Sequence, residues 1–302
     1  MGPWSHCQCD RDAYNLGPLR WDGDTALQFR RDVLRPFFDQ YLKAGAPIAN
    51  TPPVVIYNTG EDRWDRFQNW PLACSEGCPA PMKPLYLQAG FGLGFDKPGS
   101  AGADSYVSDP AKPVPYIPRP LRFPDRDRWG PWLVTDQRAV ADRTDVLGYQ
   151  TTELNAPVRI SGAPIADLIA ATTGTDADWI VKLIDVFPDE VPGQPEMGGY
   201  ELAVSMDIFR GRYRQSFEQP SAIPANQPQR YRFELPTANH AFLPGHRIMV
   251  QIQSSWFPLY DRNPQTYVPN IFFAKPSDYV KATQSVFRSS EQPSAVWLPV
   301  KP

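Results

Sequence analysis

The spacing of apolar residues changes once along the chain, from a helical period near the N-terminus to alternation over the rest. Between residues 25 and 42, apolar side chains recur every three or four positions, which is typical of an amphipathic helix. Asp24 or Thr25 can cap its start. Pro36 should kink or split it, and Gly45 can provide a left-handed cap after its end. The predicted apolar face consists of Leu27, Val33, Leu34, Phe37, Phe38, Tyr41 and Leu42.

A linker at residues 44–53, rich in proline and alanine, separates this helix from a region with the pattern of β-strands. The stretch 179–187 (WIVKLIDVF) predicts the strongest strand, and 197–214 is expected to hold another. Further strands are expected at 54–57, 85–87, 158–160, 231–235 and 248–252. Because segments rich in proline and glycine join these strands, the pattern predicts a mainly β protein with a jelly-roll β-sandwich. We place the domain boundary after residue 48. Residues 1–48 then carry the helix and the loop before it, and residues 49–302 form the β-sandwich domain.

Composition agrees with many turns and few helices. The 302 residues include 35 prolines, together with 16 Phe, 13 Tyr and 9 Trp. The formal net charge is −3, with no basic face and no apolar run of roughly 20 residues, so we expect neither nucleic acid nor a membrane as a partner. The first residues lack the apolar stretch of a signal peptide, and Met1 before Gly-Pro-Trp resembles an internal position of a longer protein.

Residues 88–130 are rich in glycine and proline. The segment Gly90–Gly94 (GFGLG) has neither the glycine spacing nor the following helix of a phosphate-binding loop. We therefore expect a turn or a bulge there rather than a nucleotide site.

The four cysteines form two close pairs. Cys74 and Cys78 could close a small loop through a disulfide, which would indicate an oxidising compartment. Cys7 and Cys9 would form a strained ring if they were bonded to each other, so free thiols are expected. A zinc site made from both pairs is the alternative, although their spacing does not match a zinc finger.

The chain contains three histidines. His240 and His246 flank Pro244-Gly245 and are interpreted as turn histidines that bond the backbone. His6 differs, because it lies in a loop ahead of the amphipathic helix. In α/β-hydrolases the catalytic histidine occupies such a loop before a late helix and comes last in the chain order of the triad. His6 is therefore the candidate catalytic residue.

A nucleophile to match His6 is missing from the sequence. No Gly-x-Ser-x-Gly elbow is present, and the segment around Ser105 (GADSY) lacks the final glycine and a following helix. A serine without an adjacent base is a weak nucleophile. The sequence thus offers a general base without the hydroxyl that it would activate.

The segment Gly2-Pro3-Trp4-Ser5-His6 resembles the catalytic-histidine motif of the α-amino acid ester hydrolases, which are relatives of cocaine esterase and the X-Pro dipeptidyl-peptidases. The resemblance continues in order along nearly the whole chain. Further matching segments are 57–60 (YNTG), 83–87 (KPLYL), 176–179 (DADW), 244–248 (PGHRI) and 254–258 (SSWFP). Cys7 is a departure, because much of the wider group has glycine there.

This resemblance implies an α/β-hydrolase domain, a helical cap and a C-terminal jelly roll, of which this chain would hold only the hydrolase tail and the jelly roll. It implies that His6 is the triad histidine of a periplasmic or secreted serine hydrolase that needs no cofactor. The substrates would be small α-amino acid esters or β-lactam amides. The nucleophile and the acid would lie upstream, so the chain alone is expected to be inactive and to need the N-terminal hydrolase segment as its partner.

Two other functions remain open on the sequence. A carbohydrate-binding β-sandwich, or an oligomerisation module that forms a homo-oligomer, would also explain the aromatic content and the missing nucleophile. The aromatic residues Trp64 and Trp70 could face an active-site mouth or belong to the sandwich core. The hydrolase interpretation adds an expectation that these others lack, namely an exposed apolar face on the helix 25–42.

Overall fold

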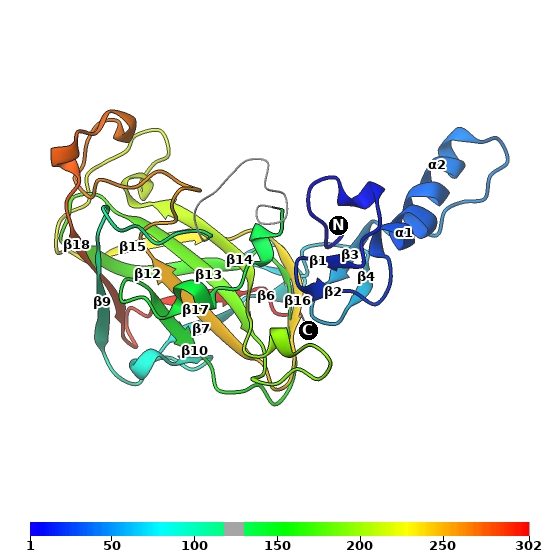
Figure 1. Ribbon diagram of the computed structural model, residues 1–302, viewed down its shortest axis with the longest axis horizontal. Helices are drawn as coiled ribbons and strands as arrows, with labels where there is room; N and C mark the ends of the chain where they lie inside the picture. The colour runs from blue at the N-terminus through cyan, green and yellow to red at the C-terminus, as the bar shows by residue number, and fades with distance from the viewer. Residues whose placement is uncertain (118–129, 302) are drawn as a thin grey trace.

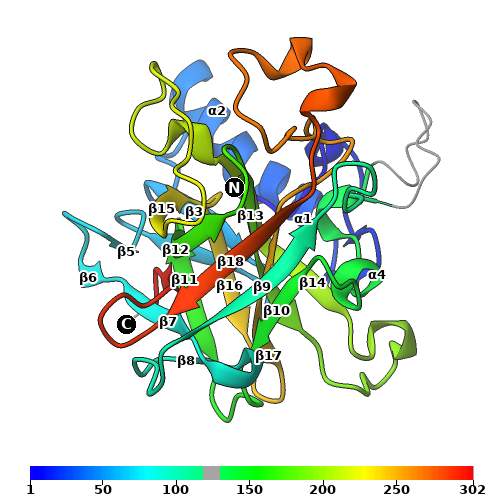
Figure 2. The same ribbon diagram turned by 90° about the vertical axis from the view of Figure 1, so that its left-hand side faces the viewer.

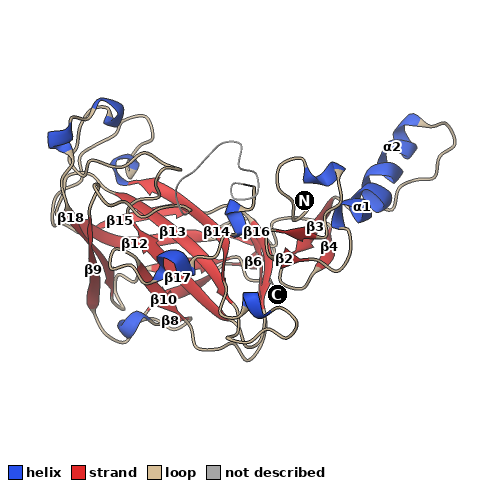
Figure 3. Ribbon diagram, in the orientation of Figure 1, coloured by secondary structure: helices blue, strands red, loops and turns tan. Residues whose placement is uncertain are grey.

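The computed structural model describes residues 1–117 and 130–301, and its body consists of two facing β-sheets (Figures 1 and 3). The first sheet contains, in spatial order, β10 (Leu147–Gln150), β17 (Arg247–Gln253), β13 (Asp178–Val186) and β14 (Glu201–Arg210). The second contains β8 (Leu93–Gly94), β7 (Lys83–Leu87), β19 (Ala295–Leu298), β12 (Ile165–Thr172), β18 (Ala282–Arg288) and β9 (Gly102–Ser108), with β15 (Gln229–Glu234) paired to β12. The mainly β prediction is confirmed.

The core lies between the two sheets. Leu85 and Leu168 face it from the second sheet, and Trp179, Val181 and Leu183 face it from the first. All nine residues of β13 are buried because loops also cover the outer face of its sheet. This double burial explains why β13 has a nearly continuous apolar sequence rather than strict alternation.

All seven strand regions expected from the sequence contain strands. Besides β7, β13, β14, β15 and β17, they are β3 (Val54–Asn58) and β11 (Val158–Gly162), which pairs with β16 (Ala238–Phe242). Gly90 has a φ of 67° inside the short 3₁₀ turn Ala89–Phe91, as expected for a turn. The stretch 118–129 of the proline-rich segment lies outside the described residues.

A smaller lobe at the N-terminus projects from the sandwich, as Figure 1 shows at its right-hand side. Besides helices it contains the 3₁₀ turn Gln8–Asp10, β1 (Asn15–Leu16), β2 (Leu19–Arg20) and the hairpin of β3 with β4 (Arg63–Phe67). Trp21 and Tyr57 pack there at 5.6 Å between ring centroids. Hairpin β3–β4 therefore packs with the first residues of the chain, and the boundary at residue 48 stays a prediction.

The predicted helix forms in two segments, α1 (Thr25–Phe29) and α2 (Arg35–Leu42), joined by a π-helical turn over Arg30–Leu34. Asp24 caps α1, since its Oδ1 accepts the backbone N–H groups of residues 26 and 27 at 3.1 and 3.0 Å. The π turn ends just before Pro36, which cannot donate a helical hydrogen bond. None of the helices in the described part of the chain is long and apolar enough to cross a lipid bilayer.

The lobe rests on the sandwich at one tight backbone contact. Gly60, in the β3–β4 turn, lies directly against the backbone of Ala241 in β16, and a Cβ at residue 60 would overlap the Ala241 carbonyl oxygen. Only glycine can occupy this position without moving one of the two backbones.

We predict that Gly60→Ala lowers the free energy of unfolding by about 3 kcal/mol, because the added methyl group must push the lobe away from β16. Gly99→Ala is the matched control, since nothing lies within 4 Å of a Cβ there. Urea unfolding followed by tryptophan fluorescence measures both. Equal stability of the two variants would contradict the tight contact.

Candidate functional site

The loop that carries His6 is anchored by the residue two positions before it. Trp4 donates its indole N–H to Thr25 Oγ1 at 2.9 Å, and its ring packs on Phe29 and Trp64 with centroids 5.2 and 5.9 Å away. The His6 imidazole itself is exposed. These contacts fix the backbone on the N-terminal side of His6, whereas the His6 ring stays exposed on the surface.

His6 has a neighbouring thiol but no carboxylate partner within residues 1–117 and 130–301. Cys7 Sγ lies 3.3 Å from His6 Nδ1. Cys7 adopts left-handed backbone angles, with φ 61° and ψ 12°, a conformation that glycine reaches more easily. Cys7 thus holds this turn in a conformation that glycine would adopt without strain.

The apolar face of the helix that follows His6 is uncovered. Figure 1 shows α2 extending away from the sandwich, and in Figure 2, which faces the opposite end of the molecule, α2 lies behind the sandwich. Phe37 and Tyr41 pack together at 4.9 Å between ring centroids, yet they are 48% and 67% exposed. The other exposed apolar side chains of this segment are Leu27, Phe38, Leu42 and Ile48. These six residues, five of them on α1 and α2 and Ile48 shortly after α2, are here called the helix face. So many large exposed apolar side chains in one segment exceed the single scattered ones that are normal on a protein surface.

The buried Asp185 accepts hydrogen bonds from two histidines at the junction of lobe and sandwich. Its Oδ2 lies 3.1 Å from His240 Nε2, and its Oδ1 lies 2.8 Å from His246 Nδ1. Thr59 of the lobe extends this hydrogen-bond network, since its Oγ1 lies 2.8 Å from His240 Nδ1. The interpretation of both histidines as backbone-bonding turn residues is wrong: His240 lies inside β16, and both rings bond a carboxylate.

Comparison with known proteins gives this geometry a context. Residues 47–297 match the model of the X-Pro dipeptidyl-peptidase C-terminal non-catalytic domain. The chain belongs to this family. His6 lies ahead of the matched residues, so the domain comprises the sandwich and hairpin β3–β4 but not the histidine loop.

Several hydrolases are similar to the whole chain. Cocaine esterase from Rhodococcus sp. (strain MB1 Bresler) is 33% identical over 99% of this chain and 50% of its own length. The solved structure of an α-amino acid ester hydrolase is 63% identical with a TM-score of 0.97, over 100% of this chain and 49% of that one. An aminopeptidase from a marine sediment archaeon, Thaumarchaeota archaeon, is 51% identical with a TM-score of 0.93, over 99% of this chain and 48% of that one. The chain therefore spans about half the length of these relatives.

The X-Pro dipeptidyl-peptidase C-terminal domain also buries a second cluster of polar side chains, which the sequence analysis did not predict. Lys182 in β13 donates to Gln137 Oε1 at 2.7 Å, and burial lowers its pKa to about 7. Burial likewise raises the pKa of Glu201, in β14, to about 7. Gln251 donates to Glu201 Oε2 at 2.9 Å. Both ionisable groups are closed off from solvent, so we interpret them as structural.

The tryptophans singled out from the sequence lie outside the sandwich core. Trp64 packs against Trp4 in the lobe and donates to Gln28 Oε1 at 2.8 Å. Trp70 donates to Ser161 Oγ at 3.0 Å. Trp64 therefore supports the histidine loop from behind. Ser105, the serine with the incomplete elbow, lies on β9 at the opposite end of the molecule from the lobe (Figure 1).

The two cysteine pairs of the chain differ in chemistry. Cys74 and Cys78 form a disulfide, whereas Cys7 and Cys9 are free thiols, as expected. Because two of the four cysteines are bonded to each other, a zinc site made from both pairs is wrong. In the part of the chain that the structure describes, no group of three or more His, Cys, Asp or Glu side chains could hold a metal ion.

We predict that Asp185→Asn destabilises the domain by about 3 kcal/mol at pH 7, because one amide oxygen cannot serve both histidines. Burial alone would raise the pKa of Asp185, but hydrogen bonds from His240 and His246 outweigh it and leave the pKa below its usual value. A depressed carboxyl pKa contributes stability above about pH 4 that is lost as the pH falls further. The difference in unfolding free energy between wild type and variant should therefore shrink in acid.

Urea unfolding at pH 7 and at about pH 3 measures this difference, with Asp189→Asn as an exposed control. A gap that stays constant between the two pH values would show that Asp185 is not ionised in the folded domain.

Proposed function

We propose that this chain is the C-terminal half of a serine hydrolase that acts on α-amino acid esters and β-lactam amides by acyl transfer. The observation that carries the proposal is the 63% identity to an α-amino acid ester hydrolase over the full length of this chain, including the His6 loop. In this proposal the sandwich is of the jelly-roll type and has no catalytic group of its own.

His6 is the general base and general acid of this proposed reaction. It would take the proton from a serine hydroxyl as the serine attacks the acyl carbon, and return it to the leaving alcohol or amine. The acyl group would then be transferred from the serine to water, or to the amine of a β-lactam nucleus. The exposed ring supports this role, since the serine and an acid that orients the imidazole must both approach from outside the described residues.

The partner in this proposal is the N-terminal hydrolase segment, which would cover the helix face. The helix face and His6 lie on the same lobe, so the same segment would both bury these side chains and deliver a serine to His6. Burial of large apolar side chains at a contact surface is a main source of association energy. The proposed location is periplasmic or secreted, which the Cys74–Cys78 disulfide supports.

The proposal predicts that the 302-residue chain alone neither hydrolyses phenylglycine methyl ester nor reacts with a fluorophosphonate probe. Addition of the N-terminal half of the 63% identical hydrolase should create activity. His6→Ala should lower that activity at least about a thousandfold, because the other triad members act only together with the histidine. Turnover by the chain alone that is lost in His6→Ala would overturn the proposal.

A second prediction concerns the uncovered helix face. Without its partner the chain should self-associate through Phe37 and Tyr41, so Phe37→Ser/Tyr41→Ser should shift sedimentation velocity toward monomer. Val107→Thr removes an exposed apolar residue on β9 and should leave the distribution unchanged. A wild-type chain that stays monomeric at high micromolar concentration would contradict the docking role of this face.

A further inference from the structure

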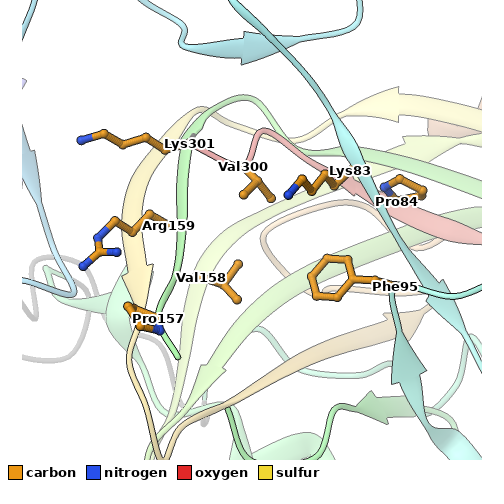
Figure 4. A pocket seen from close by; sticks show the side chains of 8 residues that line it. All are labelled: Lys83, Pro84, Phe95, Pro157, Val158, Arg159, Val300 and Lys301. Carbon is orange, nitrogen blue, oxygen red and sulfur yellow. The ribbon is translucent and has the colours of Figure 1, made fainter. Parts of the chain in front are cut away.

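A cavity of about 470 Å³ opens beside the C-terminus of the sandwich, away from the groups discussed so far (Figure 4). Its walls come from four segments of the chain, namely the start of β7, Phe95 just after β8, the start of β11 with the residue before it, and residues 300–301. Its apolar lining consists of Pro84, Phe95, Pro157, Val158 and Val300. Small-molecule sites in proteins are typically concave, mostly apolar and of roughly this volume.

The walls are held by backbone hydrogen bonds. Lys301 N–H donates to the Arg159 carbonyl at 2.7 Å, and Val300 forms an isolated antiparallel bridge with Ile160. Lys83 stands opposite Leu298 in the β7–β19 ladder. The cavity is therefore present before any ligand binds, which lowers the cost of ordering groups upon binding.

All three charged residues on the rim are cations. Arg159 is already neutralised by Glu61, whose Oε1 accepts from its Nη2 and Nε at 2.6 and 2.9 Å. The Lys301 ammonium lies 4.9 Å from the centroid of the Phe67 ring. The Lys83 ammonium has no hydrogen-bond or ion-pair partner within residues 1–117 and 130–301.

This local excess of positive charge occurs in a chain whose formal net charge is −3, so it does not follow from composition. Figure 4 shows the Lys83 side chain extending from the wall near Pro84 toward Val300, with Phe95 and Val158 on the other side of the cavity. A free ammonium thus stands next to an apolar space, and no carboxylate among the described residues lines it.

We propose that this cavity binds small organic carboxylates that have an apolar or aromatic body. The body would lie between Phe95 and Val158, and the carboxylate would pair with the Lys83 ammonium. An exposed aromatic ring beside an ammonium that has no carboxylate partner matches this combination of groups. The site is separate from His6, and the inference does not rest on the proposed hydrolase function.

The test uses the 302-residue chain with 4-phenylbutyrate as the anionic probe and 4-phenylbutylamine as the cation of similar shape. Saturation-transfer NMR titration should show saturable binding of the carboxylate and none of the amine. Lys83→Met should weaken binding about fivefold, because an exposed ion pair contributes only modestly. Phe95→Ala should weaken it further, and Phe95 is 44% exposed, so the substitution leaves the fold intact.

Lys112→Met is the matched control, since Lys112 is an exposed lysine that does not line the cavity, and its substitution should leave binding unchanged. Three results would overturn the proposal: no saturable binding of 4-phenylbutyrate, equal binding of the amine, or the same loss in Lys83→Met and Lys112→Met. None of these outcomes depends on catalytic activity, so failure of the hydrolase proposal would leave the result readable.

Discussion

The close contact between Gly60 and β16 determines how the rest of the molecule is arranged. It brings Thr59 within hydrogen-bond distance of His240, and through His240 the buried Asp185 is tied to the lobe. A buried carboxylate needs such partners because its desolvation is costly when they are absent. The lobe is thus fixed on the sandwich by polar groups that have few alternative arrangements.

A row of packed aromatic rings connects this junction to the histidine loop. Tyr57 and Trp64 of the hairpin pack together at 5.1 Å between centroids, Trp64 packs on Trp4, and His6 follows two residues later. The non-catalytic domain therefore does more than lie beside the loop. Its hairpin β3–β4 is part of the lobe that holds His6 in place.

The molecule has two surfaces that are suited to binding a partner or a ligand. The helix face and His6 are exposed on the same lobe, and both become understandable if a second segment covers them together. The cavity near Lys83 is different, because its walls are complete and its apolar and charged groups are already in position. The helix face is suited to a large partner, whereas the cavity near Lys83 has the dimensions of a small molecule.

The sequence by itself predicted the helix with a cap at Asp24 or Thr25 and the strands with regular alternation, and it singled out His6 as the candidate catalytic residue, because each of these depends on neighbouring residues or on a short motif. It did not predict β12, whose run IADLIAAT is buried like β13 but contains three alanines and an aspartate, residue types that are uncommon in strands. Only the tertiary structure brought Asp185 to two histidines more than 50 positions away, and Lys83 to Val300. These groups are joined by strand pairing over long separations, and the periodicity of one segment holds no information about such pairing.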